Sequence, residues 1–516
     1  MAGTAVAVLV FVVVAVALVG LAQAGGRFDI AFLTSVYIGR LLAVSTVQAA
    51  ASTVLSLALG IPLALSLARR TAFPGRRLLL GLLATATVLP GIVVVFAVVA
   101  VYGRSGLVGT ALRAAGIEPG GWLYGLPGIL IAHVLLNAPF CARVMLRAFE
   151  STEPEAHRLA AQLGLTGRAV FLCLDWPVIR REVPALAALV FLLCFTSFAT
   201  VLALGGGPDR ATLEVAIYEA LRLDADFARA ASLSILQLAI GVVLAGAYAA
   251  GLRRTRELPF AGRPAPRADR EIPALRTLDV VVLSLASLFI VPPLLSVAAG
   301  ATSLAALRDP EVAQAVVTSL AFALAAAVLA TGAAVLLALA ATGRGRPPVA
   351  VGLVAYVQLA VPPFTLVAGL FVVLRPVLDT ASMGPPMVVL VNALMALPFC
   401  VRLVEPPLRQ SEERHGRVAD MLGLAGLARL RLLHWPALRA PALASFAMAA
   451  SLSLGDLGVV AFFGGPDLKT LPLLLYERLG AYRTDEAAAL ALLLALLVFG
   501  LALLAIRGGE ARADAA

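Results

Sequence analysis

Long uncharged hydrophobic runs recur along the whole chain, with shorter polar stretches between them. Each run is close to the roughly 20 apolar residues that a helix needs to cross about 30 Å of hydrocarbon. Backbone groups in lipid must pair within their own segment, and the runs lack the two-residue alternation of barrel strands, so they predict helices. The pattern indicates an all-α polytopic membrane protein with twelve transmembrane helices, at residues 4–24, 41–68, 78–102, 126–142, 183–204, 229–250, 278–300, 312–341, 349–374, 385–401, 440–460 and 487–506.

The second half of the chain repeats the first. An offset of 259 residues superposes Pro139 on Pro398 and Trp176 on Trp435, with their neighbours. Each half carries six predicted spans, an even number, so the two six-helix repeats have the same orientation and are parallel. The boundaries predicted from this pattern are a first repeat at 1–252 with a polar loop at 150–177, a linker at 253–276, and a second repeat at 277–516 with a polar loop at 411–436.

Charge then fixes the expected topology. The net charge of +10 would indicate a nucleic-acid surface in a soluble protein, but 61% of these residues are hydrophobic and only 14% are charged. With a cytoplasmic N-terminus, 28 of the 40 Lys and Arg fall in cytoplasmic stretches, which is the positive-inside asymmetry. We therefore expect a multi-pass protein surrounded by membrane lipid, with both termini cytoplasmic, no nucleic-acid partner, and a linker that is a solvated cytoplasmic tether.

The first hydrophobic run is compared with a signal peptide. Ala22-Gln23-Ala24 resembles a cleavage site, but the run from Ala5 to Leu21 is long for a signal peptide and no Lys or Arg precedes it. We expect an uncleaved helix.

Each half has a polar loop after its fourth span. In the first, Thr152 and Glu155 predict a capping box, and Gly164 is a natural left-handed residue after the helix, thirteen residues before Pro177. The predicted apolar stripe of this helix is Leu159, Ala160 and Leu163.

The second loop repeats this design. Ser411 is the predicted N-cap, and Gly423 ends the helix thirteen residues before Pro436. Its apolar stripe is Val418, Ala419 and Leu422. An amphipathic helix on the bilayer surface is the alternative, but the stripe is narrow and better suited to a groove in a protein.

These loops resemble the EAA loops of ABC importer permeases of the fused, two-repeat, type I (MetI-like) class, and the resemblance covers nearly the whole chain. It implies an inner-membrane permease whose loops dock as coupling helices on a homodimeric ATPase subunit that binds the ATP. The carried-over coupling positions are Ala160, Leu163, Gly164, Pro177, Ala419, Leu422, Gly423 and Pro436, with Leu159 and Val418 beside them. The family glutamate is replaced by Arg158 and Arg417, and Glu155 is the expected substitute in the first loop.

A narrower resemblance points to a substrate. Residues 191–231 and 451–490 are similar to fused permeases for thiamine and thiamine pyrophosphate, since each contains a Gly-Gly-Pro-Asp turn followed by a tyrosine. Permeases for iron(III) or another small solute share the layout and remain the alternative.

The chain lacks groups that a complete transporter needs. Its single lysine, Lys469, follows a leucine and cannot belong to a phosphate-binding Walker loop. No stretch outside the spans is long enough for a solute-binding domain. We therefore expect no catalytic residue, no metal site and no cofactor in this chain, with ATP on a partner subunit and a periplasmic solute-binding protein as a second partner.

Candidate substrate residues are polar groups within the spans. Asp456 is the most prominent, because an ionised carboxylate at this depth costs roughly 2.5 to 3.5 kcal/mol and such residues usually face a cavity. Capping of a helix break at Gly455 is the equal alternative. Gln48, Gln237 and Gln358 are weaker candidates, since membrane glutamines commonly form interhelical hydrogen bonds.

The two longest outer stretches, 205–227 and 461–486, are the predicted docking face for the binding protein. Their repeat-related residues are Asp209 and Tyr218 in the first and Asp467 and Tyr476 in the second. Two other classes are weighed against the importer. A major-facilitator-type secondary transporter would also have six plus six helices but no coupling loops, and a membrane enzyme would need a cluster of acids, bases or metal ligands.

Overall fold

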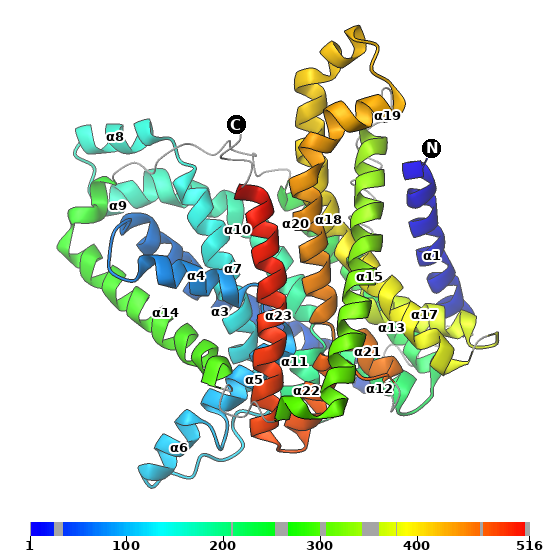
Figure 1. Ribbon diagram of the computed structural model, residues 1–516. Helices are drawn as coiled ribbons and strands as arrows, with labels where there is room; N and C mark the ends of the chain where they lie inside the picture. The colour runs from blue at the N-terminus through cyan, green and yellow to red at the C-terminus, as the bar shows by residue number, and fades with distance from the viewer. Residues whose placement is uncertain are drawn as a thin grey trace. The chain divides into compact units, whose positions relative to one another are not determined.

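The computed structural model describes residues 2–24, 35–207, 210–252, 267–299, 306–342, 361–377, 379–464 and 468–510. Every element within these ranges is a helix (Figure 1). Ten of the described helices are long and apolar enough to cross a membrane. The all-α membrane class is confirmed, and the number twelve stays a prediction, because the predicted span 183–204 is interrupted and 349–374 begins outside the described residues.

The chain forms two compact units. Unit 1 comprises residues 1–35, 213–242 and 300–516, and unit 2 comprises 36–212 and 243–299. The helices of unit 2 are α3 (Val36–Arg69), α4 (Arg76–Ala86), α5 (Gly91–Tyr102), α6 (Leu107–Ala114), α7 (Leu126–Glu150), α8 (Pro154–Gln162), α9 (Gly167–Val170), η1 (Phe171–Asp175), α10 (Trp176–Phe195), α11 (Ala199–Leu204), η3 (Ala268–Glu271) and α14 (Pro273–Ala299).

Unit 1 contains most of the second repeat. Its helices are α1 (Ala2–Ala24), α12 (Leu213–Arg222), α15 (Pro310–Ala341), α17 (Pro363–Leu374), α18 (Thr380–Met421), α19 (Gly426–Arg429), η5 (Leu430–His434), α20 (Trp435–Leu454), α21 (Gly458–Phe463), α22 (Leu471–Gly480) and α23 (Thr484–Glu510). The helix α13 (Phe227–Leu252) contributes to both units.

The compact units do not follow the sequence repeats. The helix α1, which belongs to the first repeat by sequence, packs against α15 and α17 in unit 1 (Figure 1). A Cβ added at Gly20 would lie 2.6 Å from the carbonyl oxygen of Gly369, so the two backbones touch through small residues. Reciprocally, α14 of the second repeat packs against α3, α4 and α5 in unit 2. The predicted repeat boundaries describe the sequence and are not tested by this packing.

The fifth predicted span is interrupted at the same place in both repeats. In unit 2 the helix α10 ends at Phe195 and α11 begins at Ala199. In unit 1 the helix α20 ends at Leu454 and α21 begins at Gly458, which is the repeat-related position. Broken helices leave backbone groups unpaired at membrane depth, so each break needs polar side chains beside it.

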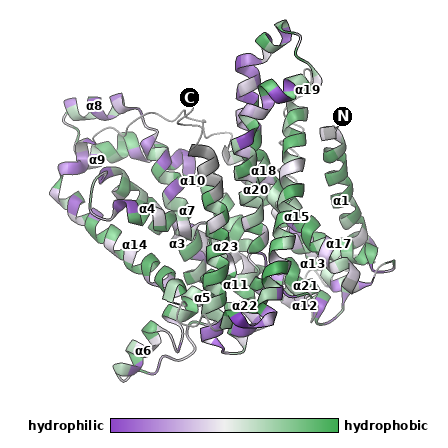
Figure 2. Ribbon diagram, in the orientation of Figure 1, coloured by the Kyte–Doolittle hydropathy of each residue, from purple (hydrophilic) through white to green (hydrophobic). Residues whose placement is uncertain are grey.

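Hydropathy separates the spans from the loops. In Figure 2 the long helices are mostly hydrophobic, and hydrophilic residues gather on α8 and α9 and around the end of α18 near α19. These are the two polar loops that the sequence predicts as functional.

Candidate functional site

The first loop ends its helix with a defined backbone motif. The amide of Leu165 donates to the carbonyl of Ala160 at 3.0 Å, and the amide of Gly164 donates to the carbonyl of Ala161 at 3.1 Å. This pair of bonds is a Schellman motif, and it requires a left-handed residue, which Gly164 supplies at φ +63°.

The second loop has the same motif. The amide of Leu424 donates to the carbonyl of Ala419 at 2.9 Å, and the amide of Gly423 donates to that of Asp420 at 3.0 Å. Gly423 has φ +66°. The predicted helix ends are confirmed in both loops, and the chain leaves the two helices in the same direction relative to their axes.

The predicted helix starts are wrong. The helix α8 begins at Pro154 with Glu153 as its N-cap, and no side chain of the described residues caps it, so Thr152 and Glu155 form no capping box. In the second loop α18 continues without interruption through Ser411, whose hydroxyl donates to the carbonyl of Leu433 at 3.3 Å. The hydroxyl is used to hold the following π-helical turn, which the local sequence does not reveal.

Both loops expose the same kind of surface. Leu159 and Leu163 are 55% and 65% exposed, and their counterparts Val418 and Leu422 are 54% and 69% exposed. Ala160 and Ala419, one position further along each helix, are buried. Pro177 and Pro436 are exposed, and each lies two residues after the end of a π-helical turn. The small residues therefore seat each helix on the protein, while the larger apolar ones face outward.

The two arginines at the family's glutamate position are also exposed. The distance between Nη1 of Arg158 and Oε1 of Glu155 is 3.7 Å, and the two side chains are 70% and 72% exposed. An exposed pair of this kind contributes little stability. Arg417 is exposed one residue before Val418. Each loop thus presents one cation beside its apolar pair.

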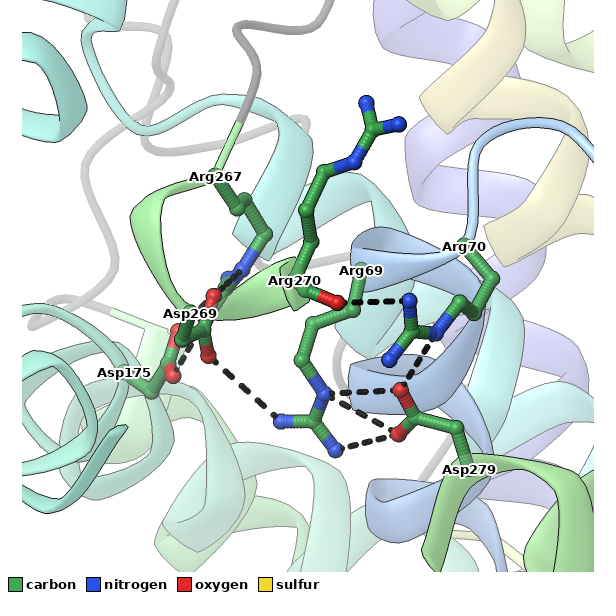
Figure 3. A network of polar contacts seen from close by, with 7 residues as sticks. All are labelled: Arg69, Arg70, Asp175, Arg267, Asp269, Arg270 and Asp279. Carbon is green, nitrogen blue, oxygen red and sulfur yellow. Dashed lines mark hydrogen bonds and ion pairs between the residues drawn. The ribbon is translucent and has the colours of Figure 1, made fainter. Parts of the chain in front are cut away.

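The first loop is anchored by a distant arginine (Figure 3). Arg267 bonds both carboxylate oxygens of Asp175, at 2.9 and 2.7 Å, and it also bonds Asp269 through Nε at 3.0 Å. These side chains are at most 4% exposed. Burial by itself lowers the pKa of Arg267, but the hydrogen bonds and charges of the two aspartates outweigh it and raise the pKa. Charge-assisted bidentate bonds of this type fix geometry strongly.

The anchor continues into α3 and α14. Arg69 bonds Asp279 through Nε and Nη2, at 3.0 and 2.7 Å, and Arg70 bonds the same carboxylate at 2.8 Å. Arg70 also donates to the carbonyl of Arg270 at 2.6 Å. The end of the predicted linker, residues 267–276, is therefore built into the protein, so the expectation of a solvated tether is wrong for this part; residues 253–266 lie outside the described residues.

His157 lies against this anchor on α8. Its side chain is buried, and its pKa is lowered first by burial and second by the charge of Arg267, against opposing effects of Asp175 and Asp269. The neutral imidazole is the form that fits this place.

The second loop is anchored locally. Arg429 of α19 bonds Glu412 through Nη2 at 2.6 Å and Asp420 through Nη1 at 2.7 Å, both on α18. Its side chain is 20% exposed. Gly416 occupies the position of His157, and a Cβ there would lie 3.4 Å from Nη2 of Arg429. A glycine lets the arginine lie across the helix.

Two of the polar residues predicted for a substrate pathway, Asp456 and Gln48, lie at the helix breaks. Asp456 accepts a hydrogen bond from the amide of Gly458 at 3.1 Å and so caps α21, while its Oδ2 has no partner among the described residues. Gln48 donates to the carbonyl of Cys194 at 2.8 Å, in the last turn before the break in unit 2. The break-capping role of Asp456 is present, and its role toward substrate stays a prediction.

Gln237 has an acidic hydrogen-bond partner, Glu214, which lies in the predicted outer stretch 205–227. It donates to Glu214, and both side chains are fully buried. Glu214 belongs to a stretch that the sequence predicts as an outer surface. Its position next to Leu213 and one turn before Ile217, which are both buried, is the sequence feature that could have indicated its burial. Gln358 lies outside the described residues.

The predicted docking stretches are short helices. Tyr218 on α12 and Tyr476 on α22 are half-buried. The rings of Tyr218 and Phe364 meet edge-on, with their centroids 6.1 Å apart. Asp209 and Asp467 lie outside the described residues. Several charges of the second stretch are used internally, since Lys469 pairs with Glu311 and Arg478 pairs with Asp309 and Glu486. Docking stays a prediction for the tyrosines.

Comparison with known proteins covers most of the chain. The family described as binding-protein-dependent transport system inner membrane component matches residues 330–508. The thiamine transport system permease protein ThiP of Brucella melitensis is 41% identical over 499 residues, which is 95% of this chain and 91% of that protein. The protein of the same description from Escherichia coli K12 is 40% identical over 478 residues, 90% of this chain and 88% of its own.

A ferric relative is matched over a smaller part. A ferric transport system permease protein of Haemophilus influenzae is 31% identical over 216 residues, which is 41% of this chain and 33% of that protein. The similarity to the thiamine permeases extends through both repeats, whereas this one spans less than half of the chain.

Proposed function

The chain belongs to the family of thiamine transport system permeases, inner-membrane components of ABC importers, and from this premise we propose that it carries thiamine or its phosphates across the inner membrane. It is a multi-pass transport component and not a catalytic enzyme. Both the major-facilitator-type transporter and the membrane enzyme are therefore excluded. Iron(III) is the weaker substrate, since the ferric relative matches only 41% of the chain.

The energy source proposed is a separate homodimeric ATPase. The observation that carries this is the equivalence of the two loops: each ends in the same Schellman motif and exposes an apolar pair to nearly the same extent, at Leu159 and Leu163 and at Val418 and Leu422. Two identical ATPase grooves need two matching surfaces. ATP would be bound entirely by that partner, with both termini of this chain on the same side of the membrane as the loops.

The exposed arginines of the two loops indicate the charge expected in the groove of the ATPase. Arg158 and Arg417 stand where the family has glutamate, and both are exposed beside the apolar pair. Charges at the rim of an interface govern the encounter rate and the choice of partner. We expect an acidic side chain in the ATPase groove.

The residues proposed for the substrate and for the binding protein lie on different elements: Asp456 lies between α20 and α21, and the two tyrosines lie on α12 and α22. Asp456 has one carboxylate oxygen without a partner in the described part of the chain, so it is the proposed acid for a cationic solute. The periplasmic binding protein is proposed to dock over Tyr218 and Tyr476, and Asp209 and Asp467, which precede them in the sequence, remain candidates for the same surface.

Substitution of the exposed leucines tests the docking. The full chain is co-expressed with its ATPase and binding protein, with Leu163 and Leu422 both changed to Glu. A carboxylate in a desolvated groove is unfavourable, so we expect the ATPase to be lost on purification and thiamine uptake in proteoliposomes to fall at least tenfold. Ile117→Glu is the control, because Ile117 is exposed to the same extent as Leu159, at 55%, and lies in neither loop.

The same proteoliposomes test the substrate. Radiolabelled thiamine should accumulate with ATP, whereas ferric ion should not. Normal ATPase association in the double variant contradicts the docking role of the loops. Uptake of ferric ion without thiamine contradicts the substrate and leaves the docking proposal standing.

A further inference from the structure

A cavity of about 700 Å³ lies between α4 and α14 in unit 2. Its walls differ sharply from one end to the other. Arg70, Arg270 and Arg276 surround the end where α3 finishes and α14 begins, together with Glu271. The rest is lined mainly by apolar residues, including Leu78, Leu79, Leu82, Val280, Leu283 and Val291.

The wall along α14 is a mainly apolar strip. Val280, Leu283, Ser287 and Val291 recur every three or four residues, so they share one face of the helix, and Ser284 and Ser287 are the polar residues of this strip. Eleven residues separate the first from the last, which is about 16 Å of helix length. The opposite wall comes from one face of α4. The cavity is therefore a groove that runs from a basic end into the hydrophobic length of a candidate membrane span.

Two of the arginines have donors left over. Arg70 uses Nε for Asp279 and Nη1 for the carbonyl of Arg270, while its Nη2 has no hydrogen-bond partner in the part of the chain that the structure describes. Arg276 is exposed, and no ion pair is formed by it among the described residues. Arg270 is paired with Glu271 at 2.8 Å, so that pair adds no net charge.

We propose that this groove binds one anionic phospholipid, with its phosphate between Arg70 and Arg276 and an acyl chain along the strip of α14. Basic pockets between membrane helices at the cytoplasmic surface are suited to acidic headgroups. A free phosphate would leave the apolar strip unused. A zwitterionic lipid would bring its own cation against Arg276.

The place of the groove connects the lipid to the first loop. Arg70 holds the backbone of Arg270 in η3, and η3 carries Asp269, which Arg267 joins to Asp175. A bound phosphate would offset the positive charge of Arg276 and accept a hydrogen bond from Nη2 of Arg70 next to this anchor. Lipid occupancy should therefore make the anchor of α8 more rigid.

Native mass spectrometry of the purified full chain tests the proposal. The probes are dioleoyl phosphatidylglycerol, dioleoyl phosphatidylcholine and glycerol 3-phosphate, each added to delipidated protein. We expect one phosphatidylglycerol to remain bound per chain at activation energies that strip phosphatidylcholine, and no retention of glycerol 3-phosphate. Retention of glycerol 3-phosphate as strongly as the lipid would identify a plain phosphate site and overturn the lipid assignment.

Three variants locate the lipid. Arg276→Gln removes an unpaired cation, and Ser287→Phe fills the groove without changing any charge; each should reduce phosphatidylglycerol retention at least fivefold. Arg77→Gln is the matched control, because Arg77 is an exposed arginine on α4 outside the cavity lining. Equal loss in Arg77→Gln, or no loss in the other two, would show general surface attraction instead of a site. Melting behaviour of each variant in detergent confirms folding, and Arg276 is exposed, so at least that variant should fold.

Discussion

The two polar loops present nearly the same outer surface but are held to the protein in different ways. The first, α8 with its Schellman turn, depends on Arg267, which is 92 positions away from Asp175 in the chain. The second is the end of the long helix α18 and is closed by Arg429, which lies 17 positions from Glu412 and 9 from Asp420. One of the two proposed docking surfaces is thus supported by a long-range anchor and the other by a local one.

The difference in burial decides the energetic weight of the two anchors. The side chains of Arg267, Asp175 and Asp269 are at most 4% exposed. Those of Arg429, Glu412 and Asp420 are 19% to 27% exposed. Removing one member of a buried pair typically costs about 3 to 5 kcal/mol, whereas part-exposed pairs contribute closer to about 1 kcal/mol. The first loop is therefore more sensitive to the loss of a single residue.

The largest effect is expected for Arg267→Gln. It leaves Asp175 and Asp269 buried without their main cation, at a cost of about 3 to 5 kcal/mol to the local structure. Hydrogen exchange of α8 should speed up while that of α18 stays the same, and the ATPase should dissociate more readily. A second change, Asp175→Asn, should restore part of the protection. Unaltered exchange in α8 would refute the long-range anchor.

Changes at the two left-handed glycines come next. Gly164→Val and Gly423→Val each force a β-branched residue to a positive φ, which costs about 1 to 2 kcal/mol. The two sites have nearly equal φ, so the effects on ATPase association should be similar. Gly116→Val, at another left-handed glycine outside both loops, is the control. A loss in only one of the two loops would contradict the proposal that both loops dock in the same way on two identical ATPase copies.

A smaller effect is expected for Arg429→Gln. Its ion pairs are part-exposed, so the change should cost about 1 kcal/mol, and the continuous helix α18 remains. Limited proteolysis of the second loop should increase modestly, with uptake largely retained. Damage as severe as that of Arg267→Gln would show that the local anchor is as important as the buried one.

The smallest effect is a pH dependence confined to the first loop. Burial lowers the pKa of His157, so protonation opposes the folded loop; its contribution is complete above the unfolded pKa of about 6.5 and declines as the pH falls below it. The protection of the α8 amides, that is, their exchange rate relative to the intrinsic rate at each pH, should therefore fall between pH 7.5 and 5.5, and His157→Asn should abolish that trend. An equal loss of protection in the variant would assign the effect to other groups.

The sequence by itself determined the features that depend on local composition. Hydrophobic runs of sufficient length predict spans because no other structure satisfies the backbone in lipid. Gly164 and Gly423 mark the helix ends because only glycine adopts the required left-handed backbone at little cost. The two polar loops and the sequence repeat could be found in the same way, and the coupling role of the loop residues stays a prediction.

The tertiary structure decided which distant groups meet. The hydroxyl of Ser411, the burial of Glu214 beside Gln237 and the anchoring of α8 by Arg267 each follow from packing between segments that the residues' own neighbours do not specify. The same holds for α1 and α14, whose apolar sequences fit many partners and which pack outside the repeat that encodes them. Local backbone preferences act over a few residues, whereas a buried charge finds its partner only when the whole chain has folded around it.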